Sequence, residues 1–259
     1  MIEGYYTAAS AMAAMLAEQQ IIGNNLANLN TVGYKQDVPR SSQFEEVLLL
    51  ALRRDPPIGA VQARHDTVGT LGTGVELLPV VLDLTPGPIR ETGRALDLAI
   101  PDVGFFRLLG ADGQDRFARA GAFDRDVDGT VVNRQGEKLL DVNGQPIVLG
   151  EGTISILSDG SIFLDGNLVT QIALTDLPEG QDWKKSGLSH FEPVAVSQVP
   201  DQVQSPRMLQ GFLEQANVDS EFQMVEMLSV LRVYEAAQVI LKPEDESIAQ
   251  AVREVGRVE

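Results

Sequence analysis

The stretch NNLANLNTVGYK, Asn24 to Lys35, decides how this chain folds. The sequence before it is rich in alanine, and from Met1 to Asn30 the only charged residues are Glu3 and Glu18. Within the stretch itself, four asparagines fall among seven residues, and their side chains compete with the backbone for hydrogen bonds. Gly33 follows, where the chain can turn away from a helix. The stretch therefore predicts the end of an unusually uncharged helix.

The residues before and within this stretch have the period of a helix that packs against other helices. Positions three and four apart alternate along a seam with one polar member, Gln19; the seam comprises Tyr5, Ala8, Met12, Met15, Gln19, Ile22, Leu26 and Leu29. The other faces are mostly alanine, whereas a solvated helix usually carries charges on its outer face. We therefore expect burial either in the core of a globular domain or among neighbouring subunits.

A second seam with the same alternation lies near the C-terminus, at Met224, Met227, Leu231, Tyr234, Gln238 and Leu241. Asp219 or Ser220 is expected to cap this helix, with Glu221 favourable in its first turn. Pro243 is expected to interrupt it, because proline lacks an amide donor, and the acidic residues after it predict a short second helix. Two similar seams, one at each terminus, predict that the ends of the chain pair with each other.

Between the two seams the pattern becomes that of strands. From about Val75 to Gln204, short apolar runs alternate with Asp-Gly and Asn-Gly pairs, which are typical of hairpin turns. We predict an α+β fold in which the N- and C-terminal helices pair as a coiled coil and the central part of the chain forms an antiparallel β-rich domain. The predicted parts are an N-terminal helix (1–35), an extended linker (36–74), the β-rich domain (75–215) and a C-terminal helical segment (216–259).

Composition excludes several classes of partner. The net charge is −17, which argues against a nucleic-acid surface and against docking on anionic lipid. The chain has no cysteine, so disulfides and thiolate metal sites are excluded. The N-terminus lacks the pattern of a secretory signal, and no run reaches the roughly 18 to 20 apolar residues that span a bilayer. These signals alone favour a soluble cytosolic protein.

The sequence offers little support for catalysis or metal binding. Asp124, Asp126 and Asp128 begin like a calcium loop, but the twelfth position holds Gln135 where a bidentate glutamate is needed, and the flanks read as strands. We therefore interpret these aspartates as solvated turn residues. The two histidines, His65 and His190, have no recognisable catalytic partner motif. We expect no catalytic residue, no metal, no cofactor and no small-molecule substrate.

Four blocks of the sequence resemble the signatures of one family, the flagellar rod and hook proteins. The first is the N-terminal block, YYTAASAMAAMLAEQQIIGNNLANLNTVGYKQ, which is similar to an apolar helix followed by NNLAN-x-NT-x-G-[FY]-K. The others, in chain order, are LDLTPGPIRETGRALDLAIPDVGFFRL, DGQDRFARAGAFDRDVDGTVVNRQGEKLLDVNGQPI and QGFLEQANVDSEFQMVEMLSVLRVYEA. They cover nearly the whole chain, and its length resembles that of the basal-body rod proteins, proximal or distal, more than that of the hook protein.

This resemblance implies a structural subunit that polymerises through its terminal helices into the rod of the bacterial flagellum, the drive shaft between motor and hook. It implies export through the flagellar type III apparatus without a cleavable signal peptide, and a place in the basal body within the cell envelope. The implied partners are further copies in a helical rod, other rod and hook proteins, and surrounding ring proteins where these are present. The β-rich domain would form the outer wall of the rod.

We predict that the assembly interface comprises Met12, Met15, Ile22, Asn24, Asn25, Leu26, Asn28, Met227, Leu231 and Tyr234. Asparagines suit such an interface because they hydrogen-bond neighbouring groups without burying net charge. The alternative from a different class is a soluble globular binding or hydrolytic protein whose terminal helices pack on its own β-domain.

Overall fold

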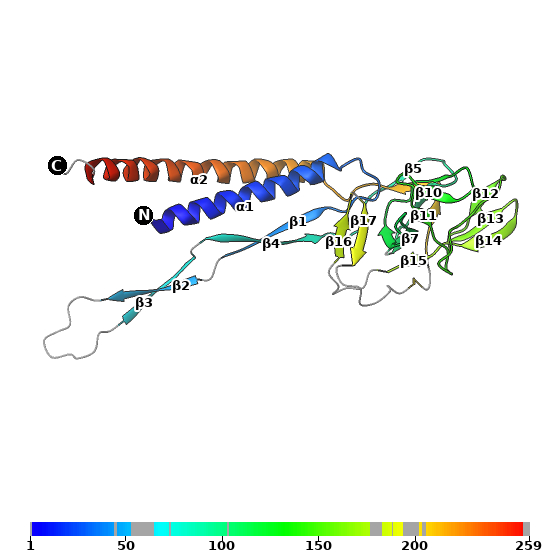
Figure 1. Ribbon diagram of the computed structural model, residues 1–259, viewed down its shortest axis with the longest axis horizontal. Coiled ribbons are helices and arrows are strands. Elements are labelled where there is room, and N and C mark those ends of the chain that lie inside the picture. The colour runs from blue at the N-terminus through cyan, green and yellow to red at the C-terminus, as the bar shows by residue number, and fades with distance from the viewer. Residues whose placement is uncertain are drawn as a thin grey trace. The chain divides into compact units, whose positions relative to one another are not determined.

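The computed structural model describes residues 2–43, 46–52, 65–72, 74–102, 104–176, 183–187, 189–193, 202–203 and 206–255. The chain divides into two compact units. The helical unit contains Met1–Asn24, Asp37–Val81 and Glu221–Glu259, and the β-rich unit contains Asn25–Gln36 and Leu82–Ser220. Two long helices, one near each end, and antiparallel strands between them confirm the predicted α+β class (Figure 1).

The first helix, α1, runs from Ile2 to Ala27 and ends within the asparagine-rich stretch, as predicted. Its predicted seam is the protected side of the helix. Ala8 and Ile22 are buried, and the seam positions between and after them, through Leu29, are half-buried. Burial follows the predicted alternation only in part, because Ala14 and Asn25, which lie outside the seam, are also buried.

The second helix, α2, runs from Ser220 to Val255, which leaves Asp219 in the capping position and Glu221 in the first turn. The expected interruption at Pro243 is wrong, because the helix continues through it. Proline removes the amide that would bond the carbonyl of Val239. Val239 is 65% exposed, so water can reach this turn and take the place of the missing donor.

The described part of the expected linker contains strands. β1 (Asp37–Gln43) pairs with β4 (Val75–Leu82), and β2 (Glu46–Leu52) pairs antiparallel with β3 (His65–Gly72). The backbone is extended there, as expected, but it is hydrogen-bonded into two-stranded ladders. Much of the glycine- and proline-rich segment from Arg53 onward lies outside the described residues.

The β-rich unit is built from short antiparallel strands, whose largest described sheet has the order β16-β17-β8-β7-β11-β10-β9, with β15 beside β7. A separate sheet has the order β12-β13-β14, and β18 and β19 pair with β6 and β5. The bounds are β5 Ile89–Glu91, β6 Leu98–Ala99, β7 Phe105–Leu109, β8 Asp115–Ala118, β9 Phe123–Arg125, β10 Val131–Asn133, β11 Lys138–Leu139, β12 Ile154–Ile156, β13 Ser161–Leu164, β14 Asn167–Gln171, β15 Leu174–Thr175, β16 Trp183–Ser186, β17 His190–Pro193, β18 Leu209–Gln210 and β19 Phe212–Glu214.

The hairpin turns follow the predicted dipeptides. The five glycines of those Asp-Gly and Asn-Gly pairs have positive φ, between 76° and 85°. A residue with a side chain rarely adopts this conformation, so glycine is required where the strands reverse this tightly. The strands that lie between the first and the last of these turns are β8 to β13.

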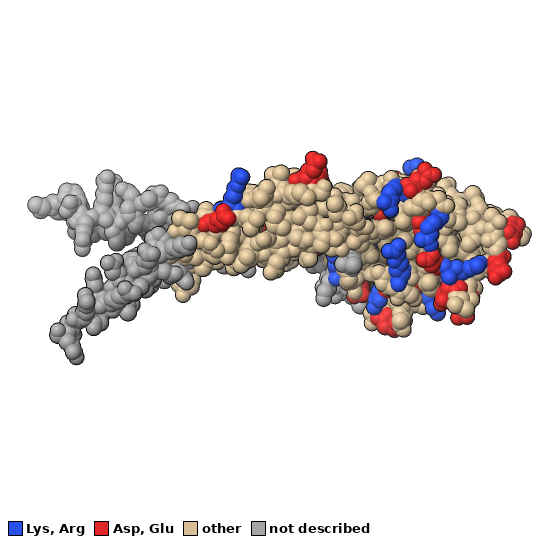
Figure 2. Space-filling view, turned by 90° about the horizontal axis from the view of Figure 1, so that it is seen from above, with Lys and Arg blue, Asp and Glu red and all other residues tan. Residues whose placement is uncertain are grey.

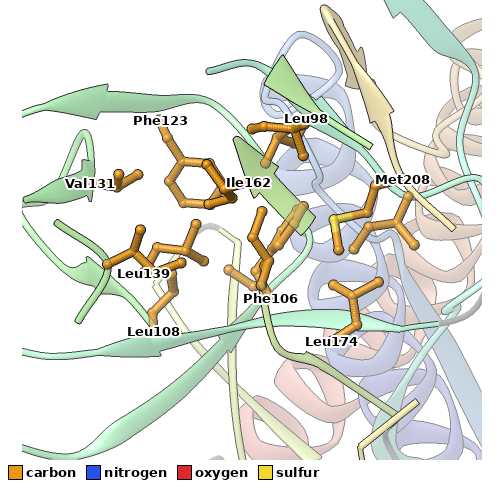
Figure 3. Close-up of a cluster of buried hydrophobic side chains, with 14 of the residues drawn as sticks. Leu98, Phe106, Leu108, Phe123, Val131, Leu139, Ile162, Leu174 and Met208 are labelled. Atoms are coloured by element: carbon orange, nitrogen blue, oxygen red, sulfur yellow. The ribbon is translucent and has the colours of Figure 1, made fainter. Parts of the chain in front are cut away.

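The main hydrophobic cluster of this unit consists of apolar side chains contributed by most of its strands (Figure 3). Phe106 and Phe123 meet edge to face, with ring centroids 5.3 Å apart. Both are fully buried, as are Leu98 and Leu108. Each such side chain stabilises the fold by about 1.5–3 kcal/mol, so this unit has a core of its own.

Candidate functional site

Three charged side chains from distant parts of the sequence meet inside the β-rich unit. Lys35 Nζ donates a hydrogen bond to Glu214 Oε1 at 2.7 Å, and Arg119 Nε donates to Glu214 Oε2 at 2.5 Å. All three residues are at most 2% exposed. We call Lys35, Arg119 and Glu214 the buried ion cluster.

The remaining donors of the buried ion cluster are satisfied by backbone carbonyls. Lys35 Nζ also donates to the carbonyl oxygen of Thr85 at 2.6 Å. The guanidinium of Arg119 donates to the carbonyl oxygens of Gly104, Ile100 and Asp102. Glu214 Oε1 accepts a further bond from the amide of Gly87 at 2.9 Å. Buried charges are tolerated only when they are paired and hydrogen-bonded in this way.

Burial and neighbouring charges shift the pKa values of Lys35 and of nearby Asp83. Burial lowers the pKa of Lys35 below its ordinary value, Glu214 opposes this effect, and the positive charge of Arg119 adds to it. Burial raises the pKa of nearby Asp83, but hydrogen bonds from Thr85 and Gln36 and the charge of Lys35 outweigh it, so the net shift is downward. The two cations repel each other, and the carboxylate of Glu214 between them offsets both this repulsion and part of the cost of desolvation.

Tyr34, immediately before Lys35, anchors the end of the asparagine-rich stretch. Its ring packs with Leu29, Ala216 and Val218, and its hydroxyl donates to Asn25 Oδ1 at 3.1 Å. The Nζ of Lys185 lies 3.9 Å from the ring centroid and donates to the carbonyl oxygen of Lys35 at 2.7 Å. The asparagines therefore do more than end a helix, since Asn25 is a buried partner of Tyr34.

Gly33 and Gln36 are hydrogen-bonded to Glu214, the last residue of β19, and to Asn217, which follows that strand. Gly33 has φ +67°, and a Cβ there would lie 2.3 Å from the backbone nitrogen of Ala120. Its amide donates to the carbonyl oxygen of Glu214 at 2.9 Å. Asn217 Oδ1 accepts from the amide of Gln36 at 2.7 Å, and its Nδ2 donates to the carbonyl oxygen of Asp83 at 2.9 Å. Residues 33–36 are thus joined by backbone and side-chain bonds to residues 214–217.

The predicted interface residues differ in exposure. Asn24 is exposed, and the half-buried members are Met12, Met15, Leu26, Asn28, Met227, Leu231 and Tyr234. Ile22 and Asn25 are at most 1% exposed, so in this conformation their side chains are already covered by the chain itself. Their use as contacts with another subunit would require the chain to open.

The fully buried positions of α2 each lie one residue before a position of the predicted seam. Gln223, Val230 and Ala237 are buried at intervals of seven, whereas Met224 is 57% exposed. Sequence reasoning also missed a set of exposed apolar residues on this helix, namely Phe222, Val225, Leu228, Val233, Val239 and Ile240. The signal was available, since only Glu221, Glu226, Arg232 and Glu235 are charged between residues 220 and 241.

The other candidate sites have structural partners. Asp124 forms an ion pair with Arg94, and Asp126 Oδ1 accepts the amide of Val127. In the part of the chain that the structure describes, no group of three or more His, Cys, Asp or Glu residues is placed to hold a metal ion. No helix among the described residues is long and apolar enough to cross a membrane.

His190 has a carboxylate partner that the sequence did not reveal. Its Nε2 lies 2.7 Å from Glu137 Oε2, and both side chains are buried. Glu137 also accepts hydrogen bonds from Arg116 and from Asn133. Its carboxylate is therefore saturated by three neighbours, which is the arrangement of a structural network. The side chain of His65 lies outside the described residues.

These features define an α+β chain whose two terminal segments are held together by a buried ion cluster beside the β-rich core. Three family models match it: flagella basal body rod protein over residues 6–35, flagellar hook protein FlgE/F/G D1 domain over residues 99–164, and flagellar basal body rod FlgEFG protein C-terminal over residues 209–254. Each match contributes one member of the cluster, in the order Lys35, Arg119 and Glu214.

Curated relatives match over almost the full length. The flagellar basal-body rod protein FlgG of Agrobacterium fabrum is 28% identical over 92% of this chain and 94% of its own. The flagellar basal-body rod protein FlgF of Caulobacter vibrioides is 26% identical over 100% of both chains. The flagellar hook-basal body complex protein FlhO of Bacillus subtilis is 25% identical over 100% of both. Over almost its full length the chain is therefore similar to flagellar basal-body rod proteins.

Proposed function

We propose that this structural subunit of the flagellar basal-body rod polymerises through uncharged faces of its two terminal helices. The observation that carries this proposal is the exposure of apolar side chains along α2. Phe222, Val225, Val239 and Ile240 are each between 57% and 67% exposed. A helix that faced only water would carry charges at these positions. Few charged side chains lie over the described helices in Figure 2, whereas the β-rich unit presents both signs.

The exposed side of α1 supports the same proposal. From Ala13 onward its exposed positions recur at intervals of three and four and carry no charge: Ala13, Leu16, Gln20, Asn24 and Ala27. Small residues such as Ala13 and Ala27 allow a neighbouring helix to approach closely. Burying one exposed aliphatic side chain stabilises a contact by about 1.5–3 kcal/mol at most, so several per helix provide a substantial driving force for assembly.

We further propose that α1 and α2 pair within the subunit as a coiled coil. Both helices belong mainly to one compact unit, and the charge of Glu226 raises the pKa of Glu18 together with burial, so these two carboxylates approach each other. The buried residues Gln223, Val230 and Ala237 repeat every seven positions, which is the period of a coiled-coil seam. This pairing would leave the opposite faces of both helices for other copies.

The location and partners follow from this assembly. The subunit would reach the basal body through the flagellar type III apparatus without cleavage of a signal, and would contact other rod and hook proteins and any surrounding rings. The β-rich unit would face outward, because its core is complete without a neighbour. The alternative of a soluble binding or hydrolytic protein is not favoured, since the relatives above are flagellar rod proteins.

The proposal is tested by adding a charge to the exposed face of α2. In cells whose only copy is Val225→Asp, we expect basal bodies without this subunit and loss of swimming, because a carboxylate would be buried between helices. The matched control is Val127→Asp, since Val127 is 99% exposed in the β-rich unit. Both purified variants should unfold at the same denaturant concentration as the unmodified chain. Normal rods built from Val225→Asp subunits would refute the proposal.

A further inference from the structure

A polar cavity in the β-rich unit lies between the end of the asparagine-rich stretch and the turn that joins β10 to β11. We call it the polar hollow. Its volume is about 280 Å³, and the side chains that give it its polar character are Asn30, Arg134, Gln135 and Ser189. Pockets for drug-sized ligands usually have volumes of about 300–1,000 Å³. The polar hollow therefore has room for a smaller molecule, of about the size of an amino acid.

Hydrogen bonds fix the turn that presents Arg134 and Gln135. Asn133 Oδ1 accepts the amide of Gln135 at 3.0 Å and the amide of Glu137 at 2.9 Å. The amide of Gly136 donates to the carbonyl oxygen of Asn133 at 3.0 Å. This wall of the polar hollow is held in place before any ligand arrives, which lowers the entropy that binding would lose.

Three side chains of the polar hollow have unused hydrogen-bonding groups. Ser189 is only 5% exposed, yet its hydroxyl makes no hydrogen bond to any described residue. Buried polar groups are normally paired, so an unpaired one needs a partner from outside the chain. Arg134 and Gln135 are exposed, and within the described ranges their side chains form no ion pair or hydrogen bond either.

Asn30 provides a further free amide from the segment that follows α1. Asn25 and Asn28 of the same stretch each accept a hydrogen bond inside the chain. The side chain of Asn30, by contrast, is without a partner in the part of the chain that the structure describes. The helix end and the anchoring of Tyr34 thus account for its neighbours but leave Asn30 without a role.

We propose that the polar hollow binds a small molecule through a single carboxylate. The guanidinium of Arg134 and the amides of Asn30 and Gln135 are donors, and no carboxylate is among the described residues that line the hollow. An arginine fork pairs with both oxygens of a planar carboxylate. A phosphate dianion is usually held by several cations or by the amides of a helix N-terminus. One cation among neutral donors suits one negative charge.

The rest of the lining indicates the body of the ligand. Val32, Ala120 and Ala122 contribute short apolar side chains, which leave space for a short apolar stem beside the carboxylate. Such a ligand would join residues 30–32 to residues 133–135 and stabilise the folded β-rich unit by mass action. The ligand is bound without being converted, so it is not a substrate. This inference does not depend on assembly into a rod.

The test uses the purified full chain and three probes: N-acetyl-L-alanine, its neutral amide and inorganic phosphate. Nuclear magnetic resonance follows the side-chain amides of Asn30 and Gln135. We expect N-acetyl-L-alanine to shift these signals to saturation, and the other two probes to leave them in place at the same concentrations. Arg134→Gln should raise the dissociation constant at least about tenfold, because charge-assisted hydrogen bonds are lost. Ser189→Ala should raise it several-fold.

The matched control is Lys138→Gln, since Lys138 is another exposed cation of the same hairpin and does not line the polar hollow. Its affinity for N-acetyl-L-alanine should equal that of the unmodified chain. Signals that N-acetyl-L-alanine leaves unmoved would overturn the proposal. So would equal binding of the acid and the amide, equal binding by Arg134→Gln and the unmodified chain, or tighter binding of phosphate.

A second experiment separates a free carboxylate from one carried by another protein. The photoreactive residue p-benzoylphenylalanine replaces Gln135 in cells, with replacement of Lys138 as the control. We expect no protein adduct that is specific to position 135. A specific adduct there would mean that a protein side chain fills the polar hollow, which would overturn the small-molecule proposal and leave the proposed function untouched.

Discussion

Lys35 and Glu214 are 179 positions apart in the sequence, yet their side chains are 2.7 Å apart in the buried interior of the β-rich unit. This ion pair joins the segment that follows the first helix to the strand that precedes the second. Arg119 completes the arrangement from the β-rich core. The chain therefore joins the segment after the end of α1 to the segment before the start of α2 within one unit, before any contact with another copy is made.

Replacing Glu214 by Gln should be strongly destabilising. The change keeps the shape of the side chain but leaves Lys35 and Arg119 without a counter-charge, and breaking a buried pair costs about 3–5 kcal/mol. Urea unfolding of the purified chain measures this directly. The control is Glu151→Gln, an exposed position, which should change stability by less than about 0.5 kcal/mol. Equal midpoints for the two variants would show that the cluster does not hold the unit together.

The lowered pKa of Lys35 predicts a specific dependence on pH. In the window between the folded pKa and the ordinary value of 10.5, the unfolded chain binds more protons at this position than the folded chain. Stability therefore rises with pH in that window because of Lys35. Lys35→Met removes this contribution, so the unmodified chain should gain stability relative to the variant as pH approaches 10.5. Unfolding both proteins in urea over a series of alkaline pH values gives the difference, and a constant difference would contradict the prediction.

Gly33→Ala tests whether the close approach to Ala120 matters beyond backbone strain. Gly93 is a matched control, because it also has positive φ, +73°, but a Cβ at that position would have no atom within 4 Å. Alanine at Gly93 should cost about 1–2 kcal/mol from conformation alone. Alanine at Gly33 should cost clearly more, since the backbone at Ala120 would have to move. Thermal unfolding of both variants decides the matter, and indistinguishable losses would mean that residues 33 and 120 separate easily.

Buried positions on the two helices could be predicted from the sequence only where the residue type itself indicates burial. The seam of α1 was predicted from apolar positions that stand out against alanine, and none of its described members is exposed, but buried Ala14 and Asn25 were missed. The seam of α2 was predicted in part, because Met227, Leu231 and Tyr234 are half-buried. The buried Gln223 and Ala237 were missed because they are poor signals of burial, and Met224 is a strong but misleading one. The asparagine-rich stretch was predicted to end a helix, but not to supply a buried partner for Tyr34.

The buried ion cluster could not be predicted from composition or periodicity. Lysine, arginine and glutamate are almost never fully buried unless they are paired. Each of these three residues, taken alone, would therefore be predicted to lie on the surface. Their pairing depends on segments that come together only in the folded unit. Lys35, Arg119 and Glu214 do lie in three of the four blocks that resemble the family, so the resemblance marked the residues without stating their role.

Glu18→Gln should stabilise the helical unit near neutral pH. Burial and the charge of Glu226 raise the pKa of Glu18 above 4.5, so the folded chain prefers the protonated carboxyl. The associated stability is fully present below pH 4.5 and is lost as pH rises through the folded pKa. Glutamine mimics the protonated form, so the variant should unfold at a higher temperature than the unmodified chain at pH 7, with the difference shrinking as pH falls below 4.5.

Glu226→Gln provides the control for the repulsion between the two carboxylates. Once Glu226 is neutral, Glu18→Gln should stabilise the chain less than it does alone. Additive effects of the two changes at pH 7 would show that the two carboxylates do not interact, and with that the proposed pairing of α1 with α2 would lose its electrostatic support.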